Sequence, residues 1–132
     1  HYDDFAGYMT EVAAHYTGEG YNVTHISPVN EPQYNWDGGQ EGSGWTNDQV
    51  AKLVRELDAS LTASGLSTDI LLGESGDWEY LYKSKSDANR SNVINAFFRE
   101  GSSALRTQLL DRRHVGRNAQ CAQTSGASCR TI

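Results

Sequence analysis

The chain of 132 residues has little cysteine and little positive charge, and it lacks long apolar runs. Both cysteines, Cys121 and Cys129, lie near the C-terminus, so no disulfide framework holds the rest of the chain. No apolar run reaches the ~18 residues of a membrane-spanning helix, and no signal peptide is present. The formal net charge of −6 argues against nucleic acid as a partner. We therefore expect neither a nucleic-acid partner nor a membrane partner.

Several motifs for other chemistries are missing. No serine lies in a Gly-X-Ser-X-Gly turn, and no glycine-rich phosphate fingerprint follows a predicted strand. His15 and His25 have no histidine four residues away and no cysteine nearby, which favours structural histidines over metal ligands. The sequence therefore predicts no metal and no cofactor.

The first 30 residues predict a helix followed by a short strand. Asp3 and Asp4 suit the positive N-terminal end of a helix, and Gly18 or Gly20 can end it. A strand follows at residues 23–29, where Pro28 predicts that the last residues leave the hydrogen-bond ladder. At helical spacing, one apolar stripe combines Phe5, Tyr8, Met9, Val12, Ala13 and Tyr16.

A second helix and strand follow a glycine-rich loop at residues 33–45. Thr46 and Gln49 form a capping box, and Gly65 is a plausible stop for the helix. The apolar run at residues 69–73 suits a parallel strand that is buried on both faces. An aromatic loop at residues 78–82 then leads to a third helix at residues 91–99. Its expected buried side comprises Val93, Ile94, Phe97 and Phe98.

This alternation of helices and strands predicts an α/β fold with a parallel sheet. The stretch of chain from residue 26 to residue 70 has a length that suits one βα unit with a long loop after the strand. Periodicity alone leaves open whether the sheet closes into an eightfold barrel or stays open and doubly wound.

The string Ile26-Ser27-Pro28-Val29-Asn30-Glu31-Pro32-Gln33 places an amide and a carboxylate at the end of the first strand. A carboxylate at such a strand end is how a barrel enzyme offers a proton donor. The string is extended by Tyr34, Trp36 and the stretch Gly39-Gln40-Glu41-Gly42. It resembles the acid/base segment of glycoside hydrolase family 30, most closely the endo-β-1,6-galactanase-like branch, over about residues 2–99.

The resemblance implies a fragment of a (β/α)8 TIM barrel, around strands 4 and 5 with their flanking helices. It places Glu31 at the fourth strand as the catalytic general acid/base, with Asn30 contacting a sugar hydroxyl. The alternative is that Glu31 is a solvated loop residue, and we favour the catalytic role. Because 132 residues are about half of the ~250 that such a barrel needs, and His1 is not a methionine, we expect a fragment or a processed product.

A retaining glycosidase needs a second carboxylate as nucleophile. Glu74 also ends a strand, but it lies only one βα unit after Glu31, whereas the family pattern puts the nucleophile three units later. At roughly 40 residues per unit that glutamate falls beyond Ile132. We therefore expect Glu74 to line the site or to accept a local hydrogen bond, and the isolated chain to be inactive.

All three tryptophans lie in the loops after the two strands, where sugar rings stack in barrel enzymes. We favour substrate contact for Trp36 and Trp78, and a structural role for Trp45 beside the second helix. Gln40 and Glu41 either bind hydroxyl groups or order the glycine-rich loop.

The last 32 residues differ from the rest of the chain. Residues 101–132 hold five arginines and one aspartate, a net +4, so residues 1–100 carry the balance of −10. Apolar periodicity also fails there. We assign residues 1–100 to a partial barrel domain and residues 101–132 to a divergent tail, which is either disordered or an out-of-frame or intron-derived reading, and we favour the latter.

The predicted function is hydrolysis of a β-linked polysaccharide such as β-1,6-galactan by a secreted, retaining glycosidase that is monomeric at full length. Sequons at Asn22 and Asn89 are compatible with secretion. The alternative is a non-catalytic carbohydrate-binding fragment. A third possibility is a fragment that does not fold stably, because an incomplete barrel leaves its edge strands unpaired.

Overall fold

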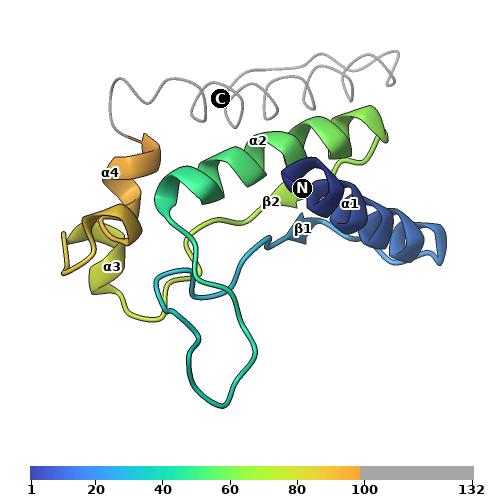
Figure 1. Cartoon of the computed structure of the whole chain (residues 1–132). Coiled ribbons are helices and arrows are strands. Elements are labelled where there is room, and N and C mark those ends of the chain that lie inside the picture. The colour runs from blue at the N-terminus through green and yellow to red at the C-terminus, as the bar shows by residue number, and fades with distance from the viewer. Residues whose placement is uncertain (99–132) are drawn as a thin grey trace.

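The computed structural model describes residues 1–98 and contains one α/β unit with flanking helices (Figure 1). The predicted alternation of helices and strands is confirmed. In chain order the elements are α1 (Tyr2–Gly18), β1 (His25–Ile26), α2 (Asn47–Ala63), β2 (Asp69–Ile70), α3 (Glu79–Tyr82), the 3-10 turn η1 (Ala88–Arg90) and α4 (Val93–Phe98).

The two strands pair in parallel, and α2 is the crossover between them. His25 lies opposite Asp69, and Ile26 lies opposite Ile70. Beyond the assigned strands, the Leu71 N–H donates to the Ile26 carbonyl at 2.9 Å. Both strands are shorter than expected: after Ile26 the chain turns away at Ser27 and Pro28, and Gly73 takes a left-handed φ of 94°. Leu71 is 47% exposed, so the prediction that this whole run is buried on both faces is wrong.

The capping box at the start of α2 is confirmed. The Thr46 hydroxyl accepts the Gln49 N–H, and the Gln49 side chain accepts the Thr46 N–H at 2.8 Å. Gly65, with φ of 70°, follows the end of the helix, as predicted. The buried stripe of α2 faces α1, the sheet and α4, and it comprises Val50, Leu53, Val54, Leu57 and Leu61.

The helix α1 packs against α2 through small side chains, which corrects the predicted stripe. Ala6, Thr10 and Ala13 are its buried residues. Small residues let two helices approach closely, so the bulkier row next to them turns outward. Half of the predicted stripe (Phe5, Met9 and Ala13) meets the core, whereas the other half is exposed: Tyr8 at 63%, Val12 at 36% and Tyr16 at 51%.

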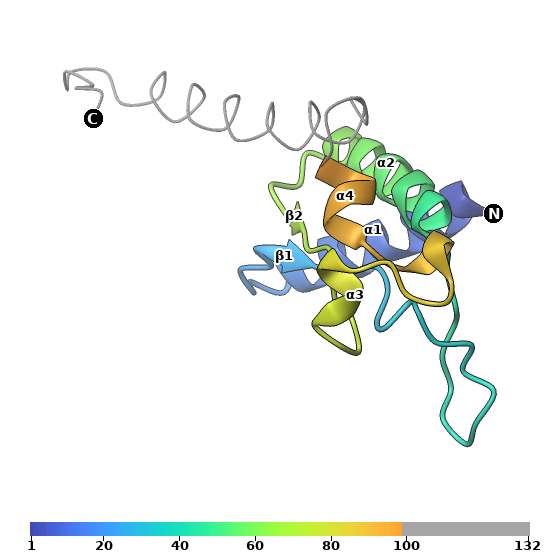
Figure 2. The same ribbon diagram turned by 90° about the vertical axis from the view of Figure 1, so that its left-hand side faces the viewer.

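The helix α4 lies against the other side of α2 (Figures 1 and 2). Val93 and Phe97 are buried against Val50 and Val54. The helix has only six described residues, and just one side of it meets α2. Ile94 and Phe98 are therefore about half exposed, contrary to the prediction, and Arg99, the expected last residue, lies outside the described residues.

The loop between β1 and α2 extends away from the helices (Figure 1). Its base is closed by the Trp45 N–H, which donates to the Pro32 carbonyl at 2.8 Å. Arg90 of η1 donates to the Asn35 side chain at 2.6 Å and so ties the loop to a distant segment. Within residues 1–98, no helix is both long enough and apolar enough to cross a membrane.

Candidate active site

The loop after β1 forms an open groove of about 480 Å³ with Glu31 in its lining. This volume lies within the range of small-molecule sites. Two aromatic side chains, Tyr34 and Trp36, and several polar groups share the lining. The full set is Glu31, Gln33, Tyr34, Asn35, Trp36, Asp37, Gly38, Gly39 and Gln40. The structure thus brings together three of the predicted site residues: Glu31, Trp36 and Gln40.

Trp36 lies flat against the backbone of Gly42. A methyl group at Gly42 would overlap the indole ring, so only glycine fits beneath it. Trp36 has a left-handed φ of 56°, which is unusual for a residue with a side chain. Its indole Nε1 is buried without a hydrogen-bond partner among the described residues. These unfavourable features concentrate at one side chain of the groove, as strain often does at functional sites.

Glu31 also has a left-handed backbone, with φ of 44°. Its N–H donates to the carbonyl of Glu74 at 2.8 Å, and its own carbonyl accepts the Tyr34 N–H at 3.2 Å. The two glutamates that follow the strands are therefore linked by a hydrogen bond between their main chains. The N–H of Glu31 is thus held by the turn after β2, and its carbonyl is held by its own loop.

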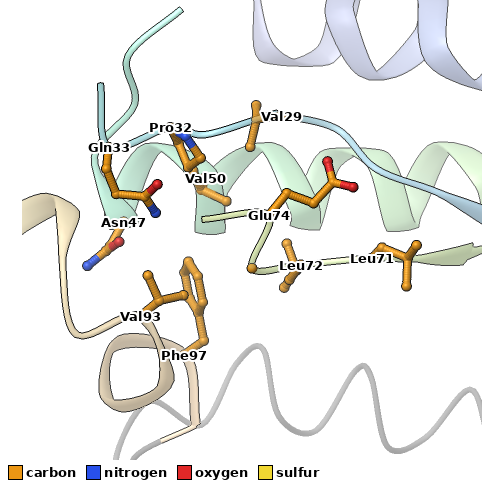
Figure 3. Close-up of a pocket in the computed structure, with 11 residues that line it drawn as sticks. Val29, Pro32, Gln33, Asn47, Val50, Leu71, Leu72, Glu74, Val93 and Phe97 are labelled. Carbon is orange, nitrogen blue, oxygen red and sulfur yellow. The ribbon is translucent and has the colours of Figure 1, made fainter. Parts of the chain in front are cut away.

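Glu74 itself lies outside the groove lining. Its carboxyl oxygen accepts a hydrogen bond from the Ser27 hydroxyl at 2.5 Å. It borders a second, narrow cavity of about 10 Å³ between the segment after β2, the start of α2 and α4. Its carboxyl group points away from Val93 and Phe97, which line the far side of that cavity (Figure 3). Of the two roles left open by the sequence, this contact supports the local hydrogen-bond acceptor.

One of the aromatic residues after β2, Tyr80, contacts the groove. Tyr34 meets Trp36 edge-on at 6.4 Å between ring centres and meets Tyr80 edge-on at 6.2 Å. Trp78 is 80% exposed at the start of α3, which makes it an unusually open indole. The expected aromatic loop at residues 78–82 is in fact a short helix, because the Asp77 side chain accepts the Glu79 N–H and nucleates a turn.

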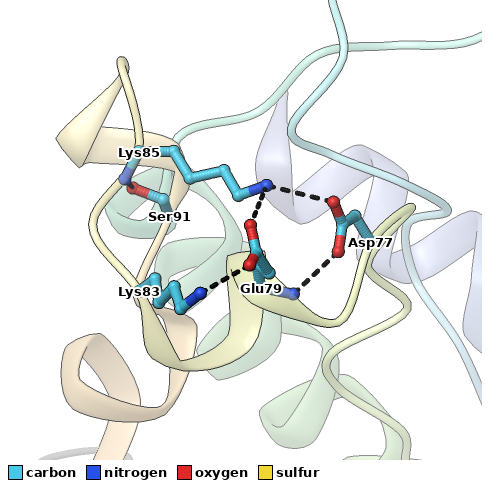
Figure 4. Close-up of polar contacts among 5 residues, drawn as sticks. All are labelled: Asp77, Glu79, Lys83, Lys85 and Ser91. Carbon is cyan, nitrogen blue, oxygen red and sulfur yellow. Dashed lines mark hydrogen bonds and ion pairs between the residues drawn. The ribbon is translucent and has the colours of Figure 1, made fainter.

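An ion-pair cluster braces α3 (Figure 4). Lys85 contacts Asp77 at 3.0 Å and Glu79 at 2.9 Å, and Lys83 also pairs with Glu79. The Glu79 N–H and Lys85 hold the pKa of the Asp77 carboxyl below its ordinary value. Lys83 and Lys85 lower the pKa of Glu79, and the two carboxylates in turn raise the pKa of Lys85. The cluster fixes the backbone beside Trp78.

Trp45 packs against α1, which agrees with the structural role that the sequence favours. Its ring contacts Tyr2 edge-on at 6.0 Å and stacks with Phe5 at 6.3 Å, so it closes the contact between the loop and α1. Asn30 is exposed beside Glu31. Among residues 1–98, no group of three or more His, Cys, Asp or Glu side chains is arranged to hold a metal ion.

Two small polar residues at the site give no signal in the sequence. Ser27 and Ser75 reach across from one strand end to the other, to Glu74 and to Gln33 respectively. Their partners lie more than 40 residues away in the chain, and serines are common in loops. Gln33 belongs to the motif string, but nothing in its spacing predicts that it is buried.

Comparisons with known proteins agree with this arrangement. The profile of O-glycosyl hydrolase family 30 matches residues 1–120. A crystal structure of a conserved exported protein from Bacteroides fragilis superposes with a TM-score of 0.72 at 29% sequence identity. The match covers 94% of this chain and 30% of that chain. No curated protein matches the sequence.

The class of protein follows from the profile, which describes glycoside hydrolases and matches this α/β unit. The chain belongs to O-glycosyl hydrolase family 30. The match extends beyond residue 99, where the resemblance was expected to end. The predicted boundary at residue 100 and the predicted nature of residues 101–132 concern a segment outside the described residues.

Proposed function

We propose that this chain supplies the acid/base half of the active site of a secreted, retaining glycosidase that cleaves a β-linked polysaccharide. One observation carries the proposal: Glu31 of a family 30 chain follows β1 and lines a groove together with aromatic side chains. The family resemblance makes β-1,6-galactan the first substrate to test. Xylan and β-1,6-glucan remain alternatives, because loops elsewhere in a barrel also shape the subsites.

In the proposed reaction the Glu31 carboxyl protonates the glycosidic oxygen as the bond to the anomeric carbon breaks. The same group then takes a proton from the water that releases the sugar. Both steps need a carboxyl group beside the scissile bond, and Glu31 borders open space in the loop after β1. We place the unit around strands 4 and 5 of a (β/α)8 barrel, in line with its parallel βαβ core.

The nucleophile of this reaction is a second carboxylate that attacks the anomeric carbon. Glu74 does not suit this role, because its carboxyl accepts the Ser27 hydrogen bond and it is absent from the groove lining. We therefore propose that the nucleophile lies outside this chain, and that the chain alone does not turn over substrate.

Sugar contacts are assigned to side chains in and beside the groove. Trp36 offers an aromatic ring, Gln40 and the exposed Asn30 offer hydrogen bonds, and Trp78 offers an exposed indole just before α3. Glu74 takes part indirectly, through its bonds to Glu31 and Ser27. Secretion is supported by the two sequons and by the similar solved structure, which is that of an exported protein. We expect a monomer at full length.

A segment exchange tests the function. Residues 1–120 replace the matching segment of an active family 30 hydrolase, which provides the second carboxylate. We expect this chimaera to hydrolyse β-1,6-galactan, and its Glu31→Gln variant to lose about 10²- to 10⁴-fold in kcat/KM. A chimaera that unfolds cooperatively but retains its activity after Glu31→Gln contradicts the assignment.

The alternative is a carbohydrate-binding fragment without catalysis, favoured by the aromatic residues around an open groove. Isothermal titration of the 132-residue chain with galacto-oligosaccharides, beside a reducing-sugar assay, measures binding and turnover separately. Binding by the chain together with an inactive chimaera supports this alternative. Binding by the chain together with an active chimaera supports the hydrolase.

A further inference from the structure

The backbone of Glu31 needs an external constraint. A left-handed φ of 44° brings the Cβ of a non-glycine residue close to its own backbone, so the conformation persists only where the surroundings impose it. The side chain of Glu31 leaves the main chain in a direction that this φ sets. Whatever imposes the left-handed backbone therefore also aims the carboxyl group.

The constraint comes from the turn after β2, at residues 73–75. Three hydrogen bonds reach this turn from the segment on either side of Glu31. The Ser27 hydroxyl bonds to the Glu74 carboxyl, the Glu31 N–H bonds to the Glu74 carbonyl at 2.8 Å, and the Gln33 Nε2 bonds to the Ser75 hydroxyl at 3.1 Å. Residues before, at and after Glu31 are thus tied to one turn of the neighbouring strand.

Gln33 is an unexpected residue for its position. The residue is only 8% exposed, and its Oε1 is buried without a hydrogen-bond partner among the described residues. An apolar side chain of the same length would fill this space without leaving a polar atom unpaired. The amide therefore lowers the stability of the fold. Its one hydrogen bond, to Ser75, fixes the position of the loop and does not stabilise the core.

We infer that Gln33 and Ser75 are positioning residues that hold the backbone of Glu31 left-handed and so aim its carboxyl group into the groove. What the carboxyl does there rests on the proposed function. Gln33 also belongs to the groove lining, but in the positioning role it acts with Ser75 through the main chain of Glu31. Glu74 contributes its carbonyl to the same arrangement, and Ser27 holds Glu74 in turn.

The test uses the 132-residue chain and the Gln33→Met variant. Methionine keeps the length of the side chain but removes both the donor and the unpaired acceptor. We expect the thermal midpoint to stay unchanged or to rise. We also expect amide hydrogen exchange at Glu31 to accelerate about tenfold. The strong intraresidue amide-to-Hα nuclear Overhauser effect of a left-handed residue should weaken, and affinity for a β-1,6-galacto-oligosaccharide should fall.

Variants at Ser75 provide the matched control. Ser75→Ala removes the hydroxyl and should reproduce the change at Glu31, whereas Ser75→Thr keeps the hydroxyl and should preserve the native signals. Because both residues form one bond, the double variant should be no worse than either single variant. These variants also decide the question if Gln33→Met fails to fold.

Unchanged exchange and an unchanged Overhauser effect at Glu31 in both Gln33→Met and Ser75→Ala would overturn the inference. A fall in thermal midpoint with general loss of protection in Ser75→Ala would overturn it as well, because it indicates a merely structural role. The nuclear magnetic resonance readouts need no sugar. If the native chain binds no oligosaccharide, the proposed function loses support, while the signals of Glu31 still decide the positioning role.

Discussion

At Gly42 the absence of a side chain determines where the indole of Trp36 lies. A methyl group there would overlap atoms of the ring, so the ring would have to move. We predict that Gly42→Ala displaces Trp36 and weakens oligosaccharide binding by about tenfold, because one aromatic–sugar contact is lost without removal of any polar group. Isothermal titration measures the change.

Gly39→Ala is the matched control for this prediction. It lies in the same loop and lines the same groove, but an added methyl group meets no atom within 4 Å. Its affinity should stay close to that of the native chain. Equal losses for both variants would show that the loop responds to any loss of glycine, and that the position of Trp36 is not what matters.

At the scale of the element, the start of α2 depends on its capping box. Thr46→Ala removes the oxygen that accepts the Gln49 N–H, and we expect it to lower the free energy of unfolding by about 1 kcal/mol. Thr46→Ser keeps the hydroxyl and should lose much less. Urea denaturation measures both, and equal stability of Thr46→Ala and the native chain would contradict the role of the box.

The ion-pair cluster predicts how α3 responds to pH. The pKa values of Asp77 and Glu79 are lowered, so their stabilisation is complete above the ordinary values of 3.8 and 4.5 and is lost as pH falls through the lowered values. The pKa values of Lys83 and Lys85 are raised, so their part is complete below 10.5 and is lost as pH rises further. The indole resonance of Trp78 should therefore stay constant between these limits and shift outside them.

Lys85→Met is the control for this pH dependence. It removes the cation that bridges both carboxylates, so the acid transition of the Trp78 resonance should move toward the ordinary pKa values of Asp77 and Glu79. The same acid transition in native chain and variant would show that the cluster does not couple to α3.

The helices could be predicted from the sequence more fully than the strands and the site. A helix carries its own signals, such as the capping box at Thr46 and the glycine at Gly65, and both appear as predicted. Pro28 correctly predicted that the chain leaves the ladder after β1, but the hydrogen bonds that hold the strand ends join residues more than 40 positions apart and had no local signal. For Glu31, the sequence predicted the position after a strand, but it could not predict the left-handed backbone.

At the scale of the whole molecule, the described fold depends on the packing of α2. Leu57 is fully buried between α1 and the sheet, and we expect Leu57→Ala to lower the free energy of unfolding by about 2–5 kcal/mol. Leu71→Ala, at a position that is 47% exposed, should cost far less. Similar losses at both positions by denaturant unfolding would contradict this account of the core.

The proposed proton-donating role of Glu31 is tested most directly by varying the leaving group. In the chimaera, kcat/KM is measured for Glu31→Gln and its parent with a β-1,6-galacto-oligosaccharide and with the matching dinitrophenyl glycoside. The sugar alkoxide needs a proton to leave, whereas dinitrophenolate leaves without one. We predict a loss of about 10²- to 10⁴-fold with the oligosaccharide and almost none with the dinitrophenyl substrate. Equal losses with both substrates would contradict the assignment of Glu31 as the acid.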